Sequence, residues 1–166
     1  VKGNHRRHFH NMREAETVIE IVRSLRKQYD DIGVIVPFNE QAARIQALLN
    51  GDEGLNDMKI STVHSFQGKE NDVIIFSTVV NEVDDFVDDG NFLNVAISRA
   101  RKKFVLVVTG NELAPSNIKD LVDYIAYNGG YNDHGQLHSV FDLLYSQYAL
   151  ERRAFLERFS DDRRYQ

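Results

Sequence analysis

The sequence predicts an α/β domain in which a mostly parallel sheet is covered by helices on both faces. Short runs of apolar, often β-branched residues lack polar alternate positions, which is typical of strands buried on both faces. These runs alternate along the chain with helices whose apolar residues recur every three or four positions. The 166 residues, 42% of them hydrophobic and 27% charged, suffice for one globular domain with its own core.

The first third of the chain predicts a lead, two helices and a strand. Residues 1–12 are basic and without apolar spacing, so we expect a flexible lead. Apolar positions at helical spacing predict an amphipathic helix over 13–29. The nearly continuous apolar run 32–36, stopped by a proline, predicts a strand. Asn39 is expected to cap a second helix, which the Asn50-Gly51 pair ends.

The middle of the chain predicts three strands and one helix. The β-branched runs 59–63 and 72–80 predict strands on either side of a stretch that contains glycine. Residues 82–89 carry five acids and no base, which is typical of a solvated loop. A helix is predicted over 92–101. The run 104–108 is the most strongly apolar strand, so we expect it at the centre of the sheet.

The last third of the chain predicts two helices. Ser116 begins an amphipathic helix that the Gly129-Gly130 pair ends. A final helix is predicted over 140–159. We therefore divide the chain into the lead, an α/β domain over 13–128, and a helical extension over 129–166.

Composition excludes several classes of protein. The net charge of −5, from 20 basic and 25 acidic residues, excludes a protein that coats nucleic acid by charge alone, so any such contact must be local. The absence of cysteine excludes disulfide frameworks and thiolate metal sites, and it suits a reducing cytoplasm. No apolar run approaches the roughly 20 residues of a membrane span. The chain does not begin with Met, and we expect it to be part of a longer protein.

Two segments concentrate polar groups that carry chemistry. Residues 61–70 follow a predicted strand and combine hydroxyls, a histidine, a glycine and charges. Residues 94–103 end in four bases among five residues. Arg99 and Arg101 are two apart, so on a helix they face different ways and serve different partners. Such an arginine either complements a helix dipole or stabilises charge on a transferring phosphoryl group.

Three segments resemble motifs of superfamily 1 helicases of the Upf/Dna2-like type. Residues 32–41 (IGVIVPFNEQ) resemble their motif IV, 62–75 (TVHSFQGKENDVII) resemble motif V, and 94–101 (NVAISRAR) resemble motif VI. The motifs occur in the family's order within residues 13–111. The resemblance implies a RecA-like domain of the P-loop NTPase type, and specifically the second such domain of an ATP-dependent helicase or translocase.

The resemblance also implies a nucleotide-facing set of residues. Arg99 would be the arginine finger that reaches the γ-phosphate of ATP. Glu70 would approach the ATP ribose or the phosphate-sensing network, Gly68 would permit a tight backbone approach, and Gln67 would couple the two domains. The sequence has neither a Gly-x-x-x-x-Gly-Lys-Ser/Thr loop nor an Asp-Glu pair at a strand end for Mg²⁺. ATP and Mg²⁺ would therefore be held mainly by a first RecA-like domain of the same protein.

A second set of residues matches positions near single-stranded DNA or RNA. Asn39, Gln41, Thr62 and His64 would hold backbone phosphates through short polar groups. Phe66 is expected in the core and not as a platform for base stacking. Two other functions stay open: a non-catalytic module that binds nucleic acid or docks a protein, and an unrelated phosphate-binding α/β enzyme. The latter requires a glycine-rich turn between strand and helix, which the sequence lacks.

Overall fold

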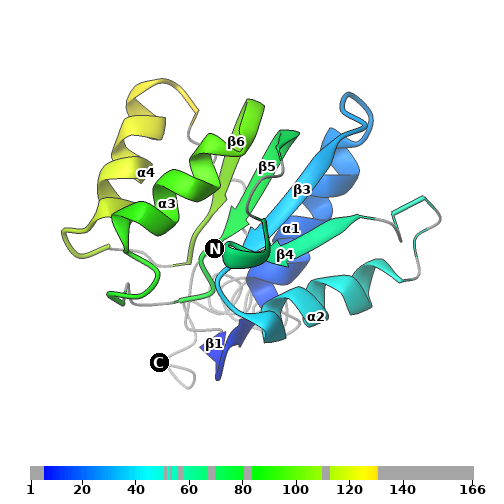
Figure 1. Cartoon of the computed structure of the whole chain (residues 1–166), viewed down its shortest axis with the longest axis horizontal. Helices are drawn as coiled ribbons and strands as arrows, with labels where there is room; N and C mark the ends of the chain where they lie inside the picture. The colour runs from blue at the N-terminus through cyan, green and yellow to red at the C-terminus, as the bar shows by residue number, and fades with distance from the viewer. Residues whose placement is uncertain are drawn as a thin grey trace, which may run out of the picture. The chain divides into compact units, whose positions relative to one another are not determined.

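The computed structural model describes residues 6–50, 52, 54–55, 58–66, 70–80, 84–109 and 113–130, all of which belong to one compact unit, Val1–Gly135 (Figure 1). Its elements follow in chain order: β1 (Arg6–Arg7), β2 (His10–Asn11), α1 (Met12–Leu25), β3 (Ile32–Val36), α2 (Asn39–Leu49), β4 (Lys59–Thr62), the 3-10 turn η1 (His64–Phe66), β5 (Asn71–Ser77), α3 (Gly90–Ser98), β6 (Ala100–Val107) and α4 (Asn117–Tyr127).

Within the described residues, the main sheet has four parallel strands in the order β4-β3-β5-β6. Val36 pairs with Thr62 at the carboxyl ends of β3 and β4, and Ser77 pairs with Val107 at those of β5 and β6. All four carboxyl ends therefore lie at one edge of the sheet, and all four amino ends lie at the other. The predicted α/β class with a mostly parallel sheet is confirmed.

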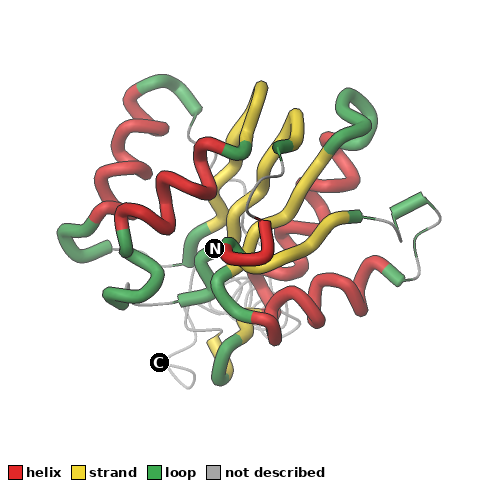
Figure 2. The backbone as a smooth tube through the Cα atoms, in the orientation of Figure 1, coloured by secondary structure: helices red, strands yellow, loops and turns green. Residues whose placement is uncertain are grey.

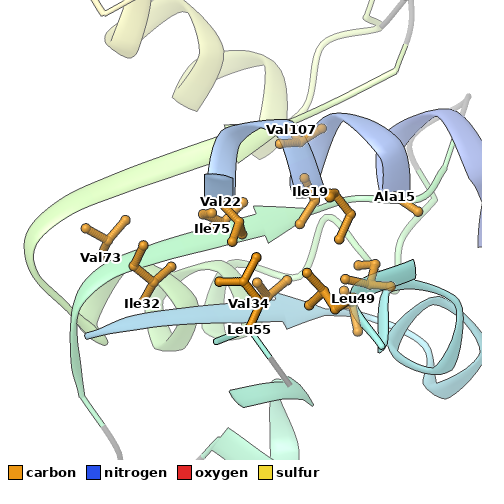
Figure 3. Close-up of a cluster of buried hydrophobic side chains, with 13 residues drawn as sticks. Ala15, Ile19, Val22, Ile32, Val34, Leu49, Leu55, Val73, Ile75 and Val107 are labelled. Carbon is orange, nitrogen blue, oxygen red and sulfur yellow. The ribbon is translucent and has the colours of Figure 1, made fainter. Parts of the chain in front are cut away.

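Helices cover both faces of this sheet, as Figure 2 shows. On one face, α1 and α2 pack on alternate strand residues such as Val34 and Ile75, and Figure 3 shows this cluster. On the other face, α3, α4 and η1 pack on the intervening residues, including Ile35 and Phe76. The side chains of β3 and β5 that point to either face are buried, which explains why these two strands lack polar alternation. Phe66 is fully buried in the second cluster, so its predicted core position is confirmed.

The place of β6 differs from the prediction. The sequence places the run 104–108 at the centre of the sheet, but β6 is an edge strand among the described strands. Its first half also carries three exposed bases, Arg101, Lys102 and Lys103. Strand order is set by pairing between segments far apart in the chain, and local apolarity does not encode it.

The lead also differs from the flexible segment that we predicted. Residues 6–7 and 10–11 form the antiparallel pair β1–β2, and Asn11 is fully buried. The Asn11 side chain accepts a hydrogen bond from the backbone N–H of Glu14 and so caps α1. A short polar residue that caps a helix explains order in a segment without apolar spacing.

The acidic segment is more structured than a solvated loop. The Asp89 carboxylate caps α3 by accepting a hydrogen bond from the backbone N–H of Phe92 (2.8 Å). The Asp88 carboxylate accepts hydrogen bonds from backbone N–H groups in the first turn of α4. Ser116 caps α4, as predicted, through the backbone N–H of Lys119. The predicted helix over 140–159 lies outside the described residues. Within the described part of the chain, no helix is long and apolar enough to cross a membrane.

Candidate nucleotide and nucleic-acid edges

The carboxyl edge of the sheet brings together most of the residues predicted to contact nucleic acid. Because β3 and β4 are paired neighbours, the segments that leave them begin side by side. Asn39 and His64 are exposed there, and Thr62 is half-buried with its hydroxyl 3.2 Å from that of Ser65. Asn39 is the first residue of α2 and not its cap, since Phe38 holds the cap position without a side-chain hydrogen bond. Three of the four predicted residues are thus accessible at one edge.

Gln41, the fourth, is fully buried. Its side-chain carbonyl accepts from the backbone N–H of Asn11 (2.9 Å), and its amide nitrogen donates to the carbonyl of Asn11 and to the hydroxyl of Ser77, both at 3.2 Å. A side chain with no exposed surface and three internal partners does not reach a strand from outside. Gln41 therefore supports the edge from within.

Aromatic rings form a row along the same edge, which the sequence did not single out. The rings of Phe9 and Phe38 have centroids 5.0 Å apart, and those of Phe38 and Phe86 are stacked at 5.7 Å. The row continues through Phe92 into the core. Phe9 is 51% exposed and Phe86 is 48% exposed, so half of each outer residue faces solvent. The three segments that carry the row are far apart in sequence, so no periodicity reveals it.

The amino edge of the sheet brings together the described residues of the nucleotide-facing set. Arg99 follows α3, and its carbonyl accepts from the backbone N–H of Asn71 at 3.0 Å. Glu70, the residue before Asn71, is exposed beside it. Within the described part of the chain, the Nε of Arg99 is buried without a hydrogen-bond partner. Gln67 and Gly68 lie outside the described residues.

Arg101 lies in β6, because α3 ends at Ser98 and not at the predicted residue 101. The helical spacing from which we inferred different faces for Arg99 and Arg101 therefore does not apply. The guanidinium of Arg101 pairs with Asp31 (2.6 Å) and Asp72 (2.9 Å), which ties the start of β6 to β5 and to the residue before β3. Lys102 joins the same group, 2.8 Å from Asp72. Hydrogen bonds from Lys102 and then from Arg101 lower the pKa of the Asp72 carboxyl below its usual range.

A buried carboxylate, Glu14, is the polar residue that sequence reasoning missed most clearly. Burial raises the pKa of Glu14 above its usual range, and hydrogen bonds from Ser77, Thr109 and the Val79 backbone act in the opposite direction. In the sequence, Glu14 occupies one position of an amphipathic helix and looks like a surface charge. Its partners lie 63 to 95 residues away, so no local signal reveals it.

Across the described ranges, no group of three or more His, Cys, Asp or Glu residues could hold a metal ion. Glu70 and Arg99 offer one acidic and one cationic side chain at the amino edge, which suits contact with a nucleotide but does not enclose one.

Comparison with known proteins assigns the family. Residues 1–112, more than half of the chain, match the AAA domain family. The chain belongs to the AAA domain family. This AAA domain is 39% identical over 104 residues to the uncharacterized ATP-dependent helicase MJ0104 of Methanocaldococcus jannaschii, a match that covers 63% of this chain and 15% of that protein.

Two further relatives are also named helicases. The domain is 44% identical over 96 residues to DNA polymerase alpha-associated DNA helicase A of Saccharomyces cerevisiae, covering 56% of this chain and 14% of that protein. It is 37% identical over 125 residues to RNA helicase Mov10l1 of Mus musculus, and this match covers 67% of this chain and 10% of that protein. The matches thus cover 15% or less of each of these relatives. All three relatives thus carry names of helicases, and the part of each that this AAA domain matches is short.

Proposed function

We propose that this AAA domain is the second RecA-like domain of a superfamily 1 helicase or translocase of the Upf/Dna2-like type. One observation carries the proposal: the two predicted sets of residues sort to opposite edges of one sheet. Asn39, Thr62 and His64 lie at the carboxyl edge, whereas Glu70 and Arg99 lie at the amino edge. A motor domain requires such a separation, because it contacts ATP and a single strand at different places.

At the amino edge, Arg99 is the arginine finger of the proposal. ATP with Mg²⁺, held mainly by a first RecA-like domain of the same protein, supplies the phosphoryl group that is transferred to water. A guanidinium stays ionised and can donate to two oxygens at once, which suits the charge that develops on the γ-phosphate. The bond between the carbonyl of Arg99 and the backbone N–H of Asn71 fixes the base of this side chain beside Glu70. Gln67 and Gly68 stay predictions.

At the carboxyl edge, a single strand of DNA or RNA is held through its backbone. Asn39, Thr62 and His64 offer short polar groups to phosphates and sugars. The half-exposed rings of Phe9 and Phe86 flank these residues and offer surfaces on which bases of any sequence can stack. Gln41 takes part by supporting the first turn of α2 from within.

The test of this function is the substitution Arg99→Ala in the longer protein that joins this domain to its first RecA-like domain. We expect kcat for ATP hydrolysis to fall by roughly 10³-fold or more, while ATP binding stays within a few-fold, because an arginine finger acts in the transition state. Arg99→Lys should recover little of the lost kcat, since an ammonium group cannot donate to two oxygens at once in the bidentate way of a guanidinium.

Lys103→Ala is the matched control, because it removes one exposed positive charge four residues from Arg99. Its kcat should equal that of the unaltered protein. If Arg99→Ala leaves kcat unchanged, the domain does not supply the finger. The non-catalytic binding module then becomes the better account of this domain.

A further inference from the structure

Glu14 places a carboxylate inside the protein at the carboxyl edge of the sheet. It lies in the first turn of α1 and is fully buried. Oε2 accepts from the Ser77 hydroxyl (2.6 Å) and from the Val79 backbone N–H (2.8 Å). Oε1 accepts from the hydroxyls of Thr109 (2.6 Å) and Thr78 (3.4 Å). Among the described residues no cation pairs with Glu14, so these donors replace the water that burial removes.

The contacts of Glu14 fix the direction of a larger hydrogen-bond network. Each hydroxyl has one proton, and Ser77 and Thr109 both donate theirs to the carboxylate. Each hydroxyl oxygen is then left to accept. Ser77 accepts from the amide of Gln41 (3.2 Å), and Thr109 accepts from the amide of Asn11 (3.0 Å). The carboxylate thereby determines how both amide side chains are turned, although it touches neither.

The same carboxylate holds a strained residue. Val79 has φ +68°, a left-handed conformation that β-branched residues rarely adopt. Both of its backbone groups are used: the N–H donates to Glu14, and the carbonyl accepts from the Asn11 amide at 3.3 Å. Such strain persists only where the surroundings over-determine the conformation, and it concentrates at sites of function.

We propose that Glu14 is a positioning residue for the carboxyl edge, where it joins the segment that enters α1, the first turn of α2 and the loop that leaves β5. Asn11 belongs to the segment that enters α1, Gln41 to the first turn of α2, and Val79 to the loop that leaves β5. The inference rests on the proposed function only in that this edge is the one proposed to hold a single strand. Glu14 does not touch the strand, and it sets the backbone from which Asn39 projects.

Glu14→Gln tests the role with little change in shape. The new NH₂ group cannot face Val79 without meeting another donor, so it must face Thr109, whose hydroxyl proton then loses its acceptor on residue 14. We expect the chain to stay folded by circular dichroism. Protection of the amides of Val79 and Ala42 from hydrogen exchange should fall by about 10-fold or more, since charge-assisted hydrogen bonds are lost. Glu20→Gln, on an exposed position of the same helix, should leave this protection unchanged.

A pair of substitutions at Thr109 separates positioning from packing. Thr109→Val keeps the shape and removes the hydroxyl, whereas Thr109→Ser keeps the hydroxyl and removes a methyl group. If Glu14 acts through hydrogen bonds, Thr109→Val should lower the protection of the Val79 amide from hydrogen exchange, and Thr109→Ser should preserve it. If the site matters only for packing, the order is reversed. This pair also decides the question if the Glu14→Gln chain fails to fold.

Binding of a mixed-sequence single strand, measured by fluorescence anisotropy on the same variants, connects the inference to function. We expect the Kd to rise by about 10-fold for Glu14→Gln and Thr109→Val and to stay unchanged for Thr109→Ser. If the unaltered chain binds no single strand, the proposed function fails, and the exchange data still decide the role of Glu14. Unchanged protection in Glu14→Gln, or the reversed order at Thr109, would overturn the inference.

Discussion

Gly33, in β3, leaves no room for a side chain. A Cβ atom at this position would lie 2.7 Å from Cζ of Phe66, 2.9 Å from Oδ1 of Asn71 and 3.1 Å from Cδ1 of Ile74. All three side chains belong to the packed interior or to the start of β5 and have little room to move. A glycine in a strand is thus required here by space and not by backbone conformation.

Gly33→Ala should therefore destabilise the domain by about 1–3 kcal/mol, the usual cost of forcing an extra carbon into a packed core. Urea unfolding followed by circular dichroism measures the change. Gly90→Ala is the control, because nothing lies within 4 Å of a Cβ built there and the residue begins α3. A Gly33→Ala chain as stable as the unaltered one would show that Phe66 and Asn71 move aside freely.

The raised pKa of Glu14 makes a second prediction at the scale of single residues. When the folded-state pKa lies above the unfolded one, the folded state holds the proton more tightly. This carboxyl's contribution to stability then falls as the pH rises from its ordinary value of 4.5 through the raised pKa. Glu14→Gln removes this titration. The free energy of unfolding of the unaltered chain, minus that of Glu14→Gln, should decrease with rising pH above about 4.5. A difference that is flat or that rises would contradict it.

At the scale of elements, local sequence patterns predict where most helices and strands lie along the chain, but not which of them are neighbours in space. β3 occupies the predicted residues, and Ser116 caps α4 as expected, because apolar runs, prolines and caps act within a few residues. The edge position of β6 depends on pairing with a segment far away in the sequence. The pairing of β1 with β2 is local, but the lead has no apolar spacing that could reveal it. The same contrast between local and distant residues holds for the candidate site. Asn39 and Arg99 are predicted from motifs of a few neighbouring residues, and their roles stay predictions. The Glu14 network joins residues far apart in the sequence, so no local pattern predicts it.

Asp88 links two elements that the sequence treats as independent. Its carboxylate accepts from the backbone N–H groups of Asn117 (3.1 Å) and Ile118 (2.9 Å), the first two residues of α4. Asp88→Ala should therefore loosen α4, with a loss of about 1 kcal/mol, the usual effect of removing an N-terminal cap. Hydrogen exchange should accelerate within α4 and not within α1. Asp85→Ala, an exposed neighbour in the same acidic segment, is the control and should leave α4 unchanged.

At the scale of the whole described unit, charge is distributed unequally between the two edges. The exposed bases Arg101, Lys102 and Lys103 lie at the start of β6, on the amino edge. At the carboxyl edge, exposed Glu40 follows Asn39, and exposed Asp85 precedes Phe86. Beside the lead, a strand at the carboxyl edge therefore meets polar groups, acids and aromatic rings, which do not attract phosphates over a distance.

This distribution predicts that single-strand binding by the isolated chain is weak and depends little on salt. Each neutralised phosphate releases counterions, so a plot of log K against log salt for this edge should correspond to about one to three phosphates. Asn39→Ala combined with Thr62→Ala should weaken binding equally for all sequences, because contacts to the backbone carry no base information. Fluorescence anisotropy with mixed-sequence DNA and RNA over a salt series makes both measurements.

The control for this prediction is the basic lead. Asn11 is buried and caps α1, so deleting residues 1–12 would damage the fold. Arg6→Ala with Arg7→Ala removes charge from the lead while keeping Asn11 in place. We expect this double variant to bind as the unaltered chain does. Tight binding with a steep salt slope, lost in the Arg6 and Arg7 variant but kept in the Asn39 and Thr62 variant, would contradict the prediction, because the charges of the lead and not Asn39 and Thr62 would then hold the strand.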